Sequence, residues 1–105
     1  MVATLATKAD FVAALKDAGD KLVVVDFTAS WCGPCQRIAP VFAKMAEEMT
    51  DVVFVKVDVD ENEEVAQDCG ISAMPTFQFY KSSEKVGEFS GASEEKIRAS
   101  IAKLK

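Results

Sequence analysis

Histidine is absent from this 105-residue chain, and its absence excludes several catalytic designs. Without an imidazole, the chain cannot build a Ser-His-Asp or Cys-His nucleophile, a histidine general base or a histidine-ligated zinc site. Positive charge is also scarce, because 12 Lys and Arg stand against 17 Asp and Glu, which gives a net charge of −5. This charge disfavours nucleic acid and anionic membrane surfaces as partners.

Long hydrophobic runs are missing as well. No apolar stretch approaches the ~18 residues that a membrane-spanning helix needs, and residues 1–10 lack the basic start and apolar run of a signal peptide. The three cysteines are an odd number, so at most two can pair internally. An odd count without a secretion signal favours a reducing compartment. We therefore expect a cytoplasmic protein without membrane association; a nuclear location, or export without a signal peptide, stays open.

The composition that remains is typical of one packed globular domain. Half of the residues are hydrophobic and 28% are charged, and no linker, repeat or change of composition divides the chain. A chain of this length buries roughly 60–65% of its unfolded surface, which is enough for one core. We expect a single domain over residues 1–105.

Short apolar runs alternate with helical patterns along the chain. We expect strands near residues 2–5, 22–27, 52–59, 76–81 and 85–89, and helices near residues 7–18, 32–49, 60–70 and 93–104. The order βαβαβαββα predicts an α/β fold with a mixed five-stranded central sheet flanked by four helices. Strands separated by helices predict right-handed crossovers and parallel pairing, and the final hairpin adds an antiparallel part.

The most informative segment is Trp31-Cys32-Gly33-Pro34-Cys35, where a buried strand passes into a helix. Unpaired backbone N–H groups and the positive end of the helix dipole favour a thiolate at this place, and the thiolate is the nucleophile in disulfide exchange. The three-residue spacing brings the second sulfur near enough to close a disulfide, and Pro34 fixes φ at the helix start. We expect Cys32 to be the more exposed, attacking thiol, and Cys35 to resolve the mixed disulfide.

Two other uses of this cysteine pair have to be weighed. Zinc requires four ligands, and only Cys69 remains as a third sulfur in a chain without histidine. An inert structural disulfide is the second alternative. Cys69 itself is expected to be a small core residue rather than a redox site.

Asp26 is out of place inside the apolar run 22–27. Burial should raise the pKa of its carboxyl, which suits a group that exchanges protons near neutral pH. Asp26 could then give a proton to Cys35, or take one from it, directly or through a water. The alternative is a buried carboxyl satisfied by a partner, for which Lys56 in the next apolar strand is the candidate.

Two further residues are ambiguous from the sequence alone. Trp31 could be core or an exposed rim, and its place in a strand-to-helix loop favours the rim. Pro75 opens a strand, where proline is ordinary and a cis peptide bond is the minority outcome.

Taken together, these motifs resemble the thioredoxin family, in particular its animal cytosolic form, over the full length of the chain. The residues that carry the resemblance are Phe27, Ala29, Trp31-Cys32-Gly33-Pro34-Cys35, Ala39-Pro40, Asp58, Met74-Pro75-Thr76 and Gly91-Ala92. The resemblance implies the thioredoxin fold and a protein-disulfide reductase that takes part in cell redox homeostasis.

The resemblance also implies roles for individual residues. Cys32 would attack and Cys35 would resolve, with a Cys32–Cys35 disulfide in the oxidised state. Asp26 would assist proton transfer to Cys35, and Pro75 would be cis in a loop that offers backbone to an extended substrate segment. Docking would use Trp31, Ala73, Met74, Gly91 and Ala92.

Further expectations concern cofactors and partners. No bound cofactor or metal is implied, because the dithiol is the redox group and NADPH acts only through a thioredoxin reductase. The other partners implied are disulfide-containing proteins such as peroxiredoxins, methionine sulfoxide reductases and ribonucleotide reductase. We expect the chain to be a monomer.

The chain departs from the usual animal pattern at several positions. Asn62 and Ala73 stand where animal members often carry cysteines, so regulation or dimerisation through those thiols is not available here. Lys56 is closer to the bacterial pattern, which leaves its pairing with Asp26 open. The turn at Ser82-Ser83 lacks the family's glycine, and a positive φ there would cost about 1 kcal/mol or more.

Two other functions share parts of this pattern. An oxidase or isomerase of the secretory pathway has the same fold, but the proline before the second cysteine goes with reducing members of the family. A redox-independent interaction module would need neither Cys32 nor Cys35. The sequence therefore favours the reductase.

Overall fold

The computed structural model describes residues 2–105 and contains five strands and four helices among them. The strands are β1 (Ala3–Thr4), β2 (Val23–Thr28), β3 (Val53–Asp58), β4 (Thr76–Lys81) and β5 (Glu84–Ser90). The helices are α1 (Lys8–Asp17), α2 (Gly33–Glu48), α3 (Glu63–Asp68) and α4 (Glu94–Leu104). This order confirms the predicted βαβαβαββα pattern.

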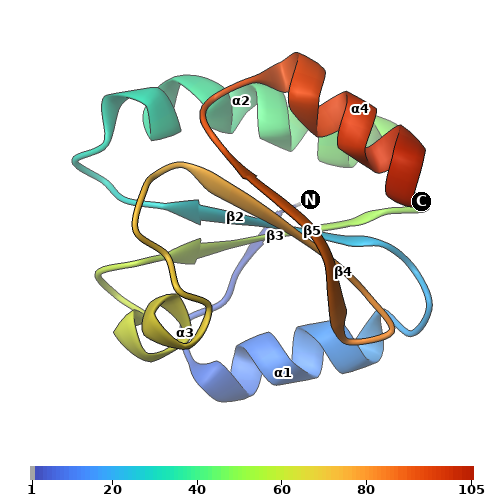
Figure 1. Ribbon diagram of the computed structural model, residues 1–105, viewed down its shortest axis with the longest axis horizontal. Coiled ribbons are helices and arrows are strands. Elements are labelled where there is room, and N and C mark those ends of the chain that lie inside the picture. Colours follow the sequence, from blue (N-terminus) through green and yellow to red (C-terminus); the bar gives the residue numbers. More distant parts are fainter. Residues whose placement is uncertain (1) are drawn as a thin grey trace.

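The strands form one mixed sheet in the order β1-β3-β2-β4-β5. Strands β1, β3 and β2 are parallel, whereas β4 is antiparallel to β2 and β5 is antiparallel to β4. The helices lie in two layers: α2 and α4 cover one face of the sheet, and α1 and α3 cover the other (Figure 1).

The direction of β4 corrects one expectation, because a helix separates it from β3 and parallel pairing was predicted. A six-residue strand spans about 20 Å, but a six-residue helix returns the chain by only about 9 Å. Helix α3 is six residues long, so the helix alone does not span the length of a strand. Strand β4 starts at the end where β3 stops, since Thr76 pairs with Phe27 near the end of β2.

Each face of the sheet carries its own apolar core. On one face, Phe42 and Met45 of α2 and Ile97 of α4 pack with Phe77. On the other face, Phe11 and Leu15 of α1 and Val65 of α3 pack with Val25 and Phe27. Strand β2 lies in the middle of the sheet and is almost entirely buried, which explains its near-continuous apolar sequence.

The helix starts follow the local sequence. Thr7 caps α1 through a hydrogen bond from the backbone N–H of Asp10, and Ser93 caps α4 through one from Lys96. Helix α3 begins later than expected, because Asn62, and not Asp60, is its cap. No helix among residues 2–105 has the length and apolar content needed to cross a membrane.

Candidate functional site

Four segments that are far apart in the sequence converge at one end of the sheet. Parallel pairing places the ends of β2 and β3 together, at Thr28 and Asp58. Antiparallel pairing brings the start of β4 and the end of β5 to the same edge, since Thr76 is paired with both Phe27 and Ser90. The loops that carry the cysteines, Pro75 and Gly91 therefore meet there because of the topology.

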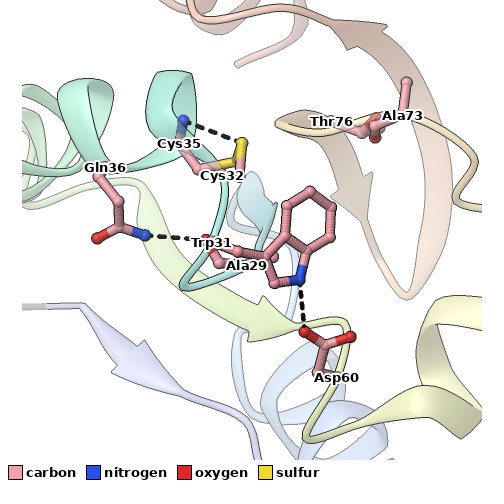
Figure 2. Close-up of a disulfide and its surroundings, with 8 residues drawn as sticks. All are labelled: Ala29, Trp31, Cys32, Cys35, Gln36, Asp60, Ala73 and Thr76. Carbon is pink, nitrogen blue, oxygen red and sulfur yellow. Dashed lines mark hydrogen bonds between the residues drawn. A yellow bond between two sulfur atoms is a disulfide. The ribbon is translucent and has the colours of Figure 1, made fainter.

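Cys32 and Cys35 form a disulfide at the first turn of α2. Cys32 is the N-cap, and the backbone N–H of Cys35 donates to Cys32 Sγ at 3.3 Å (Figure 2). The two Cα atoms are 5.2 Å apart. A sulfur in this position faces the helix N-terminus, where backbone donors and the dipole stabilise a thiolate.

Cys32 is the more exposed of the two cysteines, by a small margin. Its exposed fraction is 6%, and that of Cys35 is 0%. The neighbouring Gly33 and Pro34 are exposed, so the turn itself is open to a partner. In the disulfide form, only Cys32 of the pair has surface open to attack.

Trp31 forms an exposed rim beside the disulfide, with 66% of its surface accessible. Its indole Nε1 donates to Asp60 Oδ2 at 2.7 Å, which ties the loop after β2 to the loop after β3 (Figure 2). Asp58 Oδ1 in turn accepts from the backbone N–H of Asp60 at 2.9 Å. Sequence reasoning missed the role of Asp60, although its place directly after a strand parallel to β2 was a signal.

The loop before β4 lies against the same site. The Met74–Pro75 peptide bond is cis, the geometry that the family resemblance implies. Met74 packs against the small cluster formed by Ala29, Cys32 and Cys35. The backbone N–H of Gly91 donates to the carbonyl of Pro75 at 2.9 Å, which joins the β5 end to this loop.

The remaining docking residues expected from the resemblance are also on the surface at this end. Ala73, Gly91 and Ala92 are exposed. Gly91 has φ +114°, which a residue with a side chain rarely adopts. Of the five expected docking residues, Trp31 directly precedes Cys32 and Met74 packs against the cysteines, whereas Ala73, Gly91 and Ala92 lie in loops at the same end of the sheet.

Asp26 is buried in β2, with only 2% of its surface exposed. Loss of solvation raises the pKa of its carboxyl to about 7, and the positive charge of Lys56 opposes this rise. Among residues 2–105, no side chain or backbone group forms a hydrogen bond with Asp26 Oδ1. A carboxyl with this pKa can both take up and release a proton near neutral pH.

Lys56 is the neighbour of Asp26 across the β2–β3 pair, yet the two form no ion pair within the described part of the chain. Both side chains line a cavity of about 280 Å³ at the end of the sheet. Among the described residues Lys56 thus makes no direct contact that satisfies the Asp26 carboxyl, and its positive charge lowers the pKa of that carboxyl from nearby.

Gln36 is a second residue that the sequence analysis missed. Its side-chain Nε2 donates to the carbonyl of Ala29 at 2.9 Å, and its backbone N–H donates to the carbonyl of Cys32 at 3.1 Å (Figure 2). The same side chain lines the cavity beside Asp26. Gln36 thus holds both ends of the turn from Ala29 to Cys32.

Cys69 lies away from this site, at the C-cap of α3, and packs against the core on the α1 and α3 face. Its sulfur lies 3.6 Å from the hydroxyl of Tyr80, which donates its proton to Gln78 Oε1 at 2.7 Å. The thiol is left as the donor to Tyr80. Burial raises the pKa of Cys69, which disfavours its thiolate, so the residue is a half-buried thiol packed against the core and not a reactive one.

Comparisons with known proteins agree with this geometry. The family described as Thioredoxin matches residues 2–103. A thioredoxin of Geodia cydonium is 62% identical, with both chains covered completely, and the thioredoxin of Homo sapiens is 53% identical over 99% of each chain. The X-ray structure of Fasciola hepatica thioredoxin superimposes with a TM-score of 0.96 at 48% identity, covering 98% of this chain and 99% of that one.

Proposed function

The chain belongs to the thioredoxin family, and from this membership and the geometry of its site we propose a role for each residue around the disulfide. The overall activity follows from the family: the protein is a thiol–disulfide oxidoreductase that reduces protein disulfides and is itself reduced by a reductase. The Cys32–Cys35 disulfide at the start of α2 is the observation that carries this conclusion.

In the first step, the Cys32 thiolate attacks one sulfur of a substrate disulfide. A mixed disulfide forms between Cys32 and the substrate, and the other substrate sulfur leaves as a thiolate. Cys32 is suited to this step because it is the N-cap of α2 and is the more exposed cysteine of the pair.

In the second step, Cys35 loses its proton and attacks the sulfur of Cys32. The bond between Cys32 and the substrate breaks, the second substrate thiol is released, and the Cys32–Cys35 disulfide forms. Two electrons have then passed from the dithiol to the substrate. Complete burial of Cys35 supports this order, because a buried thiol meets the mixed disulfide and not the solvent.

Asp26 accepts the proton that Cys35 loses. Its pKa of about 7 allows the carboxylate to take a proton and to release it again at neutral pH. Lys56 tunes this pKa through its charge. The cavity that both residues line gives Asp26 a path to solvent.

The substrate segment lies over Trp31 and the loop of Ala73, Met74 and Pro75, with Gly91 and Ala92 at its other edge. The exposure of Trp31, Ala73, Gly91 and Ala92 supports this placement, and a side-chain-free backbone at Gly91 permits close approach of an extended chain. The reaction needs no bound cofactor, since the dithiol carries the electrons and NADPH acts through the reductase.

The partners are a thioredoxin reductase and disulfide-containing proteins. Peroxiredoxins, methionine sulfoxide reductases and ribonucleotide reductase are the substrate proteins we propose, with the protein acting as a monomer in the cytoplasm. The acidic charge of the chain supports the exclusion of nucleic acid.

Two variants test the roles of the cysteines. Cys32→Ser should abolish reduction of a protein disulfide, since the attacking sulfur is lost. Cys35→Ser should instead accumulate a mixed disulfide, visible as a covalent adduct by mass spectrometry without reductant. Continued turnover by Cys32→Ser, or a substrate adduct that accumulates on Cys35 in Cys32→Ser and not on Cys32 in Cys35→Ser, would reverse the assignment.

A further inference from the structure

The catalytic helix carries a cation one turn beyond Cys32. Side chains on a helix lean toward its N-terminus, and residues four apart share a face. Arg37 follows this rule: its Nη1 lies 3.4 Å from the point that a Cβ on Gly33 would occupy. Because Gly33 has no side chain and directly follows Cys32, the guanidinium lies against the backbone of the catalytic turn.

Arg37 has no anionic partner in the part of the chain that the structure describes. Among residues 2–105, its side chain forms neither an ion pair nor a hydrogen bond, and it is exposed. Arg98, the other arginine, differs completely, since it bonds Glu94 at 2.8 Å and Glu48 at 3.1 Å. Arg98 thus joins α4 to α2, whereas the N–H donors of Arg37 form no hydrogen bond among the described residues.

The surroundings of Arg37 make this end of α2 positive in a chain of net charge −5. The first turn of the helix contains no acidic residue, so nothing offsets the positive end of the helix dipole there. Two acids near the disulfide are already engaged: Asp58, at the end of β3, accepts from the backbone of its own loop, and Asp60 accepts from Trp31. A guanidinium with free donors is suited to a carboxylate.

We propose that Arg37 is a specificity-determining residue that pairs with an Asp or Glu carboxylate next to the disulfide of the substrate protein. Protein disulfides flanked by acidic residues are then reduced faster than neutral or basic ones. The inference rests on the proposed function, because the substrate lies over Cys32 and Gly33 only when Cys32 is the attacking sulfur. The contact acts on docking and leaves the electron and proton transfers unchanged.

The test uses three disulfide-bonded peptides that differ only in the residue beside each cysteine, which is Glu, Gln or Lys. We expect the unaltered protein to have a kcat/KM about threefold higher for the Glu peptide than for the Gln peptide, the size typical of one exposed ion pair. Arg37→Gln should bring this ratio to about one, and Arg37→Glu should shift the preference to the Lys peptide. High salt should remove the preference of the unaltered protein.

A matched control separates this local effect from net charge. Lys44 is exposed on the same helix two turns farther on, and Lys44→Gln removes the same charge. The Glu/Gln ratio should be retained in this variant. The proposal would be overturned if the Glu/Gln ratio of kcat/KM equals one in the unaltered protein. It would also be overturned if this ratio is unchanged in Arg37→Gln, or if it falls equally in Lys44→Gln. Failure to reduce even the Gln peptide would instead count against the proposed function.

Discussion

The buried carboxyl of Asp26 is a single residue whose proposed role in proton transfer lowers the stability of the fold. Its carboxyl is buried in the central strand, one oxygen has no hydrogen-bond partner, and its pKa is raised to about 7. In the unfolded chain the same group titrates near pH 3.8. Between these two values the folded state binds more protons than the unfolded state, so the stability of the fold decreases as the pH rises through this window.

Asp26→Asn removes this titration. The difference in unfolding free energy between the variant and the unaltered protein should therefore increase by about 2 kcal/mol, in favour of the variant, from pH 5 to pH 8. Urea denaturation at the two pH values measures the difference.

The same variant should slow disulfide reduction, because Cys35 loses its proton acceptor. A stability difference that does not change with pH would show that the carboxyl titrates normally.

Cys69 illustrates the opposite case, a thiol that its environment makes unreactive. Burial raises its pKa, and its sulfur faces the hydroxyl of Tyr80. In the reduced protein at pH 7, iodoacetamide should therefore alkylate Cys32 at least ~10-fold faster than Cys69. Mass spectrometry of quenched samples gives both rates. In denaturant Cys69 should react like a free cysteine, and equal rates in the native protein would contradict the account.

Among the elements, the turn between β4 and β5 has a backbone conformation that does not suit its residues. Lys81 pairs with Glu84, so Ser82 and Ser83 form a two-residue hairpin turn. Their φ angles are 53° and 64°, in the left-handed region that disfavours residues with a side chain. Asn-Gly is the sequence that such a turn prefers.

Replacing both serines, Ser82→Asn together with Ser83→Gly, should thus stabilise the fold by about 1 kcal/mol. The midpoint of thermal unfolding reports the change, and activity should be retained because the turn lies at the end of the sheet away from Cys32. The reversed pair, Ser82→Gly with Ser83→Asn, has the same composition and serves as a control. A lower midpoint for Asn-Gly would mean that the turn is held by other contacts.

The sequence predicted the elements well where the information was local. The near-continuous apolar run of β2, the cap at Thr7 and the cysteines at a helix start are all patterns within a few residues, and each was found as expected. The direction of β4 was mispredicted, because it depends on the short reach of α3 relative to a strand. Asp60 was missed because its partner, Trp31, is 29 residues away.

At the scale of the whole molecule, the fold gathers its chemistry at one end of the sheet. Parallel pairing of β2 and β3 and antiparallel pairing of β4 and β5 bring the cysteines, Asp60, Pro75 and Gly91 together. The hydrophobic cores on the two faces hold this arrangement rigid. No sequence-local pattern predicts such a convergence, since it follows only from strand order and direction.

The central claim is that the Cys32–Cys35 pair donates electrons to other protein disulfides. The most direct test is its reduction potential, measured by equilibration in defined thiol/disulfide buffers while the fluorescence of Trp31 is followed. The account predicts one two-electron transition at a potential below that of the cytosolic glutathione pool. A potential well above that of the pool would make the protein an electron acceptor, and the reductase function would be contradicted.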